Sequence, residues 1–281
     1  MSLFHAILLG LLQGATEFLP VSSSGHLVLL KSLMGIETEG VLWEVALHVG
    51  TLGAVLLLFW RDIRDLLVGW FRGLARLRRD GWKRVWGDCA EFRHGWYIIV
   101  ATLPAGIAGI AAKHLVERAF ASPILTAAMI FVTGEILWLT RPHSLLRQTG
   151  KIRLRDSLLI GLAQAVAIIP GISRSGSTIS AGLMCGVERE QAARFSFLLS
   201  VPVILGAALL EGRKITALPH DQIVPLLVGM GVALVSGIIA LCLLLRVVRA
   251  ARLHWFAWYC WAVGLAGVLY FWIAARAEWG Y

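Results

Sequence analysis

The chain has 281 residues, of which 58% are hydrophobic and only 15% are charged, and its mean hydropathy is +0.76. This composition excludes a soluble globular protein and indicates a protein embedded in a lipid bilayer. The formal net charge of +9 does not predict nucleic-acid binding in such a chain, because the basic residues of membrane proteins mark their cytoplasmic loops.

Six stretches are apolar and long enough to cross a bilayer, which takes roughly 20 residues. They are residues 42–60, 96–112, 122–140, 194–212, 223–245 and 255–275. Two further apolar stretches, residues 3–30 and 157–186, are interrupted by Pro, Gly and Ser. We therefore predict an all-α polytopic membrane protein with about six transmembrane helices and two unusual apolar segments.

The Lys and Arg residues indicate how these segments are oriented. Nineteen of the 26 lie in four connections, within residues 61–93, 141–155, 189–194 and 246–252. Under the positive-inside rule these connections face the cytoplasm. Stretch 157–186 then has cytoplasmic charge on both sides, and each half of it is too short to span. We expect a re-entrant hairpin there, and by the same logic a hairpin at 3–30 that enters from the opposite face.

An internal repeat relates the two hairpins. A shift of 151 residues places "GLLQGATEFLPVSSSGH" (10–26) over "GLAQAVAIIPGISRSGS" (161–177) without a gap. Within one membrane domain, 1–281, repeat one is then 1–150 and repeat two 151–281. Each repeat holds one hairpin and three spans, an odd number, so the two are predicted to be inverted. Inverted repeats with broken helices place their irregular tips together near the midplane, where binding sites form.

The first tip carries polar groups suited to phosphoryl transfer. Gln13 and Glu17 are four residues apart and share a helix face. A turn of three serines, Ser22 to Ser24, follows Pro20 and precedes His26. His26 is predicted to attack phosphorus or to serve as base for Ser23 or for water. Glu17 is predicted to hold a divalent cation, Mg²⁺ or Ca²⁺, with Gln13 as a weaker oxygen ligand.

The second tip, "PGISRSGST", is typical of an anion site. Arg174 lies among hydroxyl side chains, those of Ser173, Ser175, Ser177 and Thr178. Such a turn directs backbone N–H groups and a helix N-terminus at one point, and a guanidinium fits phosphate oxygens. An arginine at membrane depth indicates function. The simpler alternative is that Arg174 pairs with Glu17 only to lock the two hairpins together.

Two other patterns stand beside the tips. Glu44 and His48, again four residues apart, either support the site or form only an interhelical polar pair. Residues 61–86 mix Arg with Trp, Leu and Phe at helical spacing, which is typical of an interfacial helix on anionic lipid.

The two tip motifs together resemble the undecaprenyl-diphosphatase family, also called the bacitracin-resistance phosphatases. The resemblance rests on Gln13 to Glu17 running into "FLPVSSSGH" and on "PGISRSGST", and the hydropathy pattern matches over essentially the whole chain. It implies a multi-pass enzyme of the bacterial cytoplasmic membrane, with an active site open to the outer face and assisted by a divalent cation. The implied reaction hydrolyses undecaprenyl diphosphate to undecaprenyl phosphate and inorganic phosphate, recycling the lipid carrier of peptidoglycan synthesis and conferring bacitracin resistance.

The resemblance also implies residue roles. Glu17 is similar to the essential acidic residue, Ser23 and His26 to the catalytic pair, and Arg174 to the diphosphate clamp. The hydroxyls of Ser22, Ser173 and Thr178 correspond to supporting groups. Position 13 is Gln where other members have Glu, which leaves Glu17 as the sole anionic ligand for a cation.

A transporter or polyprenyl-phosphate flippase remains the alternative, because inverted repeats with re-entrant hairpins are also a transporter design. A structural scaffold would explain none of the polar residues at the tips. His26 beside Ser23, facing Arg174, is the feature expected to favour the enzyme, since transport needs an anion site but no nucleophile. The expected partners are a polyprenyl diphosphate lipid and the membrane, with pairing into a homodimer left open.

Overall fold

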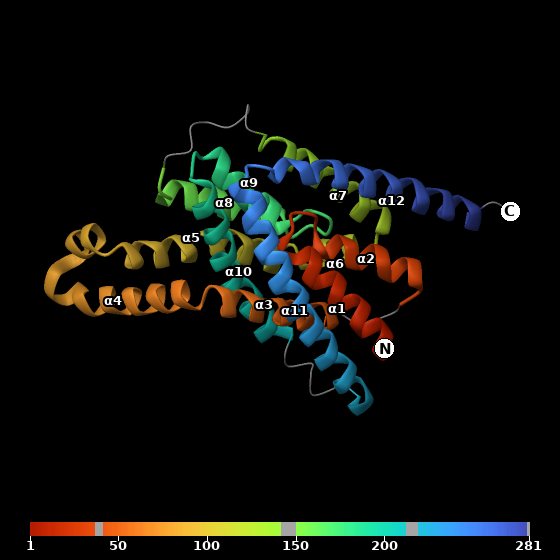
Figure 1. The fold of residues 1–281 in the computed structure, drawn as a ribbon, viewed down its shortest axis with the longest axis horizontal. Coiled ribbons are helices and arrows are strands. Elements are labelled where there is room, and N and C mark those ends of the chain that lie inside the picture. The colour runs from red at the N-terminus through yellow and green to blue at the C-terminus, as the bar shows by residue number, and fades with distance from the viewer. Residues whose placement is uncertain (37–41, 142–149, 212–218, 280–281) are drawn as a thin grey trace.

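The computed structural model describes residues 1–36, 42–141, 150–211 and 219–279, and these are almost entirely helical (Figure 1). The only extended pairing among them is a single bridge between Gly150 and Val187. The helices are α1 Leu3–Phe18, α2 Ser23–Met34, α3 Leu42–Leu58, α4 Trp60–Asp88, α5 Ala90–Ala111, α6 Lys113–Phe120, α7 Pro123–Trp138, α8 Leu154–Val166, α9 Arg174–Met184, α10 Arg189–Glu211, α11 His220–Arg249, the short 3-10 helix η3 Leu253–Trp255, and α12 Phe256–Trp279.

Four segments of the described chain are long and apolar enough to cross a membrane without a break: α5, α10, α11, and η3 with α12. The number is up to six if each of two bent pairs is counted as one span, namely α3 with α4, bent by 80°, and α6 with α7, bent by 98°. The protein is thus an all-α, multi-pass membrane protein, as the composition predicts. The predicted spans 42–60 and 122–140 fall on the bent pairs, and residue 212 of the predicted span 194–212 lies outside the described residues.

The helix predicted to lie on the membrane surface, residues 61–86, falls within α4. This helix runs beside α5, and the pair projects away from the other helices (Figure 1). Aromatic rings join the two: Trp82 lies 5.5 Å from Phe92 and 5.7 Å from Trp96, measured between ring centroids. Part of the apolar face of α4 is therefore covered by protein, whereas Phe71 and Leu67 stay exposed. Contact of α4 with anionic lipid stays a prediction.

The two hairpins are packed in matching ways. α1 lies against α11, and α8 lies against α5. A Cβ atom on Gly10 would come within 2.4 Å of the carbonyl oxygen of Gly229, and one on Gly161 within 2.6 Å of the carbonyl oxygen of Ala101. Both glycines are required because backbone meets backbone at these points. They are equivalent under the 151-residue shift, so both halves use the same device, and the repeat boundaries themselves stay a prediction.

The buried core surrounds the ends of the hairpins. Phe197 of α10 contacts Phe18 edge-on, with ring centroids 5.8 Å apart, and also contacts Phe59 at the bend between α3 and α4. Phe18 and Phe197 are completely buried. Such a pair stabilises the fold by roughly 0.5–1.5 kcal/mol beyond its area burial. Phe18 follows Glu17 directly, so this packing fixes the end of α1 that carries the carboxylate.

Candidate active site

The two broken hairpins meet at their tips, as the repeat predicts. α1 ends at Phe18 and α2 begins at Ser23, while α9 begins at Arg174. Ser22 caps α2, its hydroxyl accepting from the backbone N–H of Gly25 at 3.2 Å. Ser173 caps α9 in the same way, accepting from Gly176 at 3.0 Å. Each tip thus ends in a serine that caps the helix that follows it.

Both turns use unusual backbone conformations. Gly171 has φ 95°, and a Cβ atom there would lie 2.2 Å from the carbonyl oxygen of Thr126, so only glycine fits. Ser22 has φ 71° and ψ 94°, a conformation that L-residues seldom adopt. A residue held this way costs of order 1–3 kcal/mol, and such residues cluster at functional sites. The turn before Ser23 is therefore a strained element that the surrounding packing holds in place.

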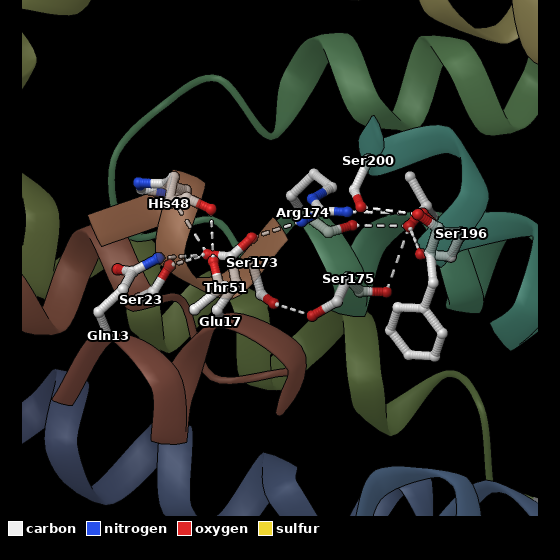
Figure 2. Close-up of polar contacts among 12 residues, drawn as sticks. Gln13, Glu17, Ser23, His48, Thr51, Ser173, Arg174, Ser175, Ser196 and Ser200 are labelled. Carbon is white, nitrogen blue, oxygen red and sulfur yellow. Dashed lines mark hydrogen bonds and ion pairs between the residues drawn. The ribbon is translucent and has the colours of Figure 1, made fainter. Parts of the chain in front are cut away.

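Glu17 is the centre of the site (Figure 2). Its carboxylate is almost fully buried. Oε2 accepts hydrogen bonds from Ser23 Oγ at 2.6 Å and from Gln13 Nε2 at 3.0 Å, while Oε1 forms an ion pair with Arg174. The carboxylate thereby joins α1, α2 and α9.

Arg174 reaches across from the second tip. One terminal nitrogen of its guanidinium pairs with Glu17, and the other, Nη1, donates to the carbonyl oxygen of Ser196 on α10 at 3.4 Å. Its side chain is 17% exposed, so the cation lies largely out of water. Breaking a buried ion pair by removing one partner typically destabilises a protein by 3–5 kcal/mol.

His48 on α3 completes the group. Its Nε2 lies 3.3 Å from Glu17 Oε2, and its Nδ1 lies 2.6 Å from the carbonyl oxygen of Glu44. Because a carbonyl only accepts, Nδ1 carries a proton, and the ring attracts the carboxylate when Nε2 is protonated as well. The two alternatives given for Glu44 and His48 therefore apply to different members of the pair. His48 supports the site, whereas the Glu44 carboxylate pairs with Lys31 on α2.

His26 has its hydrogen-bond partners outside this group. Its Nδ1 is 2.8 Å from the carbonyl oxygen of Ser22, and its Nε2 is 2.9 Å from the hydroxyl of Tyr259 on α12. The two rings are stacked, with centroids 5.6 Å apart. Both ring nitrogens are engaged, one by the backbone oxygen of the strained turn and the other by a phenol from a distant helix. The catalytic role of His26, facing Arg174 beside Ser23, stays a prediction.

Most of the other predicted hydroxyls have partners within the second tip, and one of them, Ser175, also reaches the first tip. Ser173 Oγ lies 3.2 Å from Ser175 Oγ, and Ser175 also reaches the carbonyl oxygen of Leu19 at 3.4 Å. Thr178 donates to the carbonyl oxygen of Arg174 at 2.8 Å. The hydroxyl of Ser177 is the exception, because it is buried without a hydrogen-bond partner among the described residues.

The sequence of the chain is similar to those of known proteins. The model of a protein family described as "Bacitracin resistance protein BacA" matches residues 6–266. The chain belongs to this family. It is 45% identical to the undecaprenyl-diphosphatase of Desulfatibacillum aliphaticivorans, over 92% of this chain and 95% of that protein. It is 42% identical to the undecaprenyl-diphosphatase of Thermomicrobium roseum, and 40% to that of Methanosphaera stadtmanae, each over 96% of this chain and 98% of the relative.

The family resemblance and the geometry agree on three residues. Glu17, Ser23 and Arg174 lie together at the meeting of the tips, although 157 positions separate Glu17 from Arg174. His48 is the residue that sequence reasoning did not assign. The only signal for it is its place one helical turn after Glu44 on the helix following the first hairpin, and that pattern does not say which of the two side chains turns toward Glu17.

The predicted cation ligands satisfy part of what a divalent ion needs. Gln13 Oε1 is buried and has no hydrogen-bond partner among the described residues, so one amide oxygen beside Glu17 is available. The described residues contain no cluster of three or more His, Cys, Asp or Glu side chains that could hold a metal. This donor set fits an ion such as Mg²⁺, which binds through one or two protein oxygens plus substrate phosphates.

Proposed function

We propose that this protein is a phosphatase that hydrolyses undecaprenyl diphosphate to undecaprenyl phosphate and inorganic phosphate. One observation carries the proposal: a serine hydroxyl and an arginine guanidinium from two re-entrant hairpins contact the same buried carboxylate. A hydroxyl held on a carboxylate is an activated nucleophile, and a guanidinium beside it binds phosphate oxygens. The curated names of the relatives support this substrate and favour a phosphatase over a transporter.

In the proposed reaction, Ser23 Oγ attacks the terminal phosphorus. Its proton passes to Glu17 Oε2, 2.6 Å away, and the anhydride bond to the inner phosphate breaks. The proton then goes to the departing undecaprenyl phosphate. Water attacks the phosphoserine in the second step and gives a proton to Glu17, which passes that proton to Ser23 Oγ as phosphate leaves. Ser23 is preferred over His26 as nucleophile because both ring nitrogens of His26 are engaged elsewhere.

The site carries an excess of positive charge when His48 is protonated, since Arg174 and His48 surround one carboxylate. A buried site with this balance attracts an anion. When the diphosphate enters, Arg174 can exchange Glu17 for phosphate oxygens and offset the charge that spreads over the transferring group. This exchange also frees Glu17 Oε1, so the ion pair that locks the tips in the free protein becomes part of the reaction.

A divalent cation is part of the proposal. Glu17 and the unpartnered Gln13 Oε1 would hold it, and its chemistry would be to neutralise charge on the bridging phosphate oxygens. Ser22, Ser173, Ser175, Ser177 and Thr178 are proposed to support substrate binding. Ser177, whose buried hydroxyl has no partner among the described residues, is the one most available to contact the phosphate directly.

The architecture suits a lipid substrate. A long prenyl chain can stay in the bilayer between helices while its diphosphate reaches the tips, so the enzyme need not extract it. From the charge distribution we propose that the protein resides in the bacterial cytoplasmic membrane, with the site open to the outer face. The proposed role is recycling of the lipid carrier for peptidoglycan synthesis, in keeping with the bacitracin-resistance description of the family.

The proposal is tested with purified protein, undecaprenyl diphosphate and Mg²⁺, by measuring release of inorganic phosphate. Wild type is expected to release one phosphate per lipid, and rapid quenching is expected to trap phosphate on Ser23. Arg174→Ala is expected to lower kcat/KM by about a hundredfold or more. Lys113→Ala, which removes an exposed cation on α6, is the matched control. Failure of wild type to release phosphate, with movement of lipid phosphate between leaflets instead, would establish the transporter alternative.

A further inference from the structure

A second cavity, separate from the Glu17 site, lies between α1, α11, η3 and α12. Its volume is about 710 Å³, within the range of ligand-binding pockets. Apolar side chains form most of its wall, among them Leu12 and Phe256. It extends to Leu19 and Val21, which belong to the turn of the first hairpin. The cavity therefore touches the active-site turn from a side that Glu17, Ser23 and Arg174 do not occupy.

Two arginines line the other part of this cavity. Arg246 is on the last turns of α11, and Arg252 precedes η3 with its guanidinium 4.5 Å from the ring of Trp255. Neither forms an ion pair with a carboxylate of the described residues, and no carboxylate lines the cavity. Arg249, the last residue of α11, differs because Glu190 neutralises it at 2.9 Å. Arg246 and Arg252 at the cavity thus have no carboxylate partner among the described residues, whereas the charge of Arg249 beside it is neutralised.

An apolar wall with two guanidinium groups that have no carboxylate partner among the described residues fits a lipid whose headgroup is a phosphomonoester. Such a group carries about −1.5 to −2 charges at pH 7, which two arginines balance, and guanidinium forks match phosphate oxygens. A zwitterionic or singly charged diester headgroup would leave the arginines partly uncompensated. The apolar side chains of the wall then contact the hydrocarbon chain of the lipid.

We propose that this cavity is a second lipid site, which binds a polyprenyl monophosphate with its phosphate on Arg246 and Arg252. The prenyl chain lies along Leu12 and reaches Leu19 and Val21. The inference rests on the proposed function only in assigning a prenyl chain to the bound lipid. By the charge distribution the phosphate would lie at the cytoplasmic end, opposite the proposed opening of the active site.

The contact between His26 and Tyr259 lies at the wall of the cavity. Tyr259 lines the cavity, and its hydroxyl reaches His26 Nε2 at 2.9 Å. His26 in turn holds the carbonyl oxygen of Ser22, next to Ser23. A chain in the cavity therefore contacts both the turn and the pair of rings that supports it. Occupancy is expected to change KM or kcat at the active site without any contact with the reacting phosphate.

The test is photolabelling with a diazirine-bearing geranylgeranyl phosphate, followed by mass spectrometry of the labelled peptides. Using Ser23→Ala protein removes turnover, so lipid binding is read independently of hydrolysis. Labelling is expected in residues 12–21 and 246–259. Arg252→Gln is expected to weaken that labelling about tenfold, whereas the matched single-charge change Arg249→Gln is expected to leave it unchanged. Native mass spectrometry should show the same difference as one bound lipid lost.

Three competitors identify what the cavity recognises. Unlabelled geranylgeranyl phosphate is expected to compete, and inorganic phosphate at the same concentration is not, because it lacks the chain. Phosphatidylglycerol is expected to compete at least about tenfold more weakly, since its diester offers one charge. Equal competition by phosphatidylglycerol, or equal labelling of the Arg252→Gln and Arg249→Gln proteins, would overturn the inference. Phosphate release by wild type without cavity labelling would overturn the inference alone, and labelling without phosphate release would overturn only the proposed function.

Discussion

The two hairpin tips share their supports and differ in their chemistry. In both, a serine caps the second helix and lies near a serine two residues on, at 3.3 Å for Ser22 with Ser24 and 3.2 Å for Ser173 with Ser175. The supporting glycines Gly10 and Gly161 also occupy equivalent positions. What the halves keep in common is therefore the means of turning a chain sharply at membrane depth.

The positions that differ are those that carry charge. Under the 151-residue shift, Glu17 corresponds to Ile168 and Ser23 to Arg174. Even the shared glutamines behave differently: Gln13 Nε2 donates to the Glu17 carboxylate, whereas Gln164 Nε2 donates to the carbonyl oxygen of Ala101. A repeated scaffold thus supplies the acid and the nucleophile from one copy and the cation from the other. The two complete each other because the tips meet at the carboxylate of Glu17.

The largest effect is expected from Glu17→Gln, which makes the first tip resemble the uncharged second tip at that position. The substitution removes the proton acceptor of Ser23 and leaves Arg174 without its carboxylate. We expect phosphate release to fall by about a thousandfold. Thermal unfolding should show destabilisation of about 3 kcal/mol, because a largely buried cation loses its partner. A kcat within threefold of wild type would contradict the role of Glu17.

The adjacent residues Ser23 and Ser24 are expected to have different roles, one in catalysis and the other in the turn. Ser23 donates to Glu17, whereas the Ser24 hydroxyl lies near Ser22. Ser23→Ala is expected to lower kcat by about a hundredfold or more, since the nucleophile is lost. Ser24→Ala should lower only stability, by about 1 kcal/mol. Steady-state phosphate release and melting temperature measured on both proteins check the distinction, and equal losses of kcat would remove Ser23 from its proposed role.

Substitution of His26 tests whether the strained turn affects the rate of the reaction. His26→Ala removes the imidazole from the carbonyl oxygen of Ser22, which keeps only the backbone N–H of residue 26 at 3.1 Å. We expect kcat to fall about tenfold as the turn relaxes and Ser23 moves. His26→Asn retains a donor and should recover part of the loss. The readout is kcat and KM for both variants beside their melting temperatures. Complete loss in His26→Asn, with normal stability, would instead indicate a direct role for the imidazole.

The smallest effect is expected from substitution of the two glutamines, Gln13 and Gln164. Gln13→Leu removes a donor to the reacting carboxylate and is expected to lower kcat several-fold, on the order of a 1 kcal/mol change. Gln164→Leu removes only a hydrogen bond to backbone and should change stability by about the same amount with kcat unchanged. Phosphate release by the two variants gives the comparison. A loss of kcat in Gln164→Leu would show that the second tip contributes more than its cation.

Sequence patterns alone were sufficient to predict the class of the protein, the two interrupted segments and the meeting of their tips, whereas the pairing of Glu17 with Arg174 was only an alternative. These followed from strong physical requirements. Apolar stretches of sufficient length must lie in lipid, broken backbone at membrane depth must be buried in protein or line a cavity, and isolated charges there must find partners. A 151-residue repeat then identified which two breaks belong together.

Only the tertiary structure decided which histidine meets the carboxylate. His26 lies nearer in sequence, yet Ser22 and Tyr259 engage its ring, and His48 on α3 occupies the place beside Glu17. The bend between α3 and α4 and the cavity beside Tyr259 were equally out of reach of sequence patterns. Such features depend on the rotation of each helix about its axis and on which distant helix packs against it. Long-range packing sets both, and no local spacing of residues encodes them.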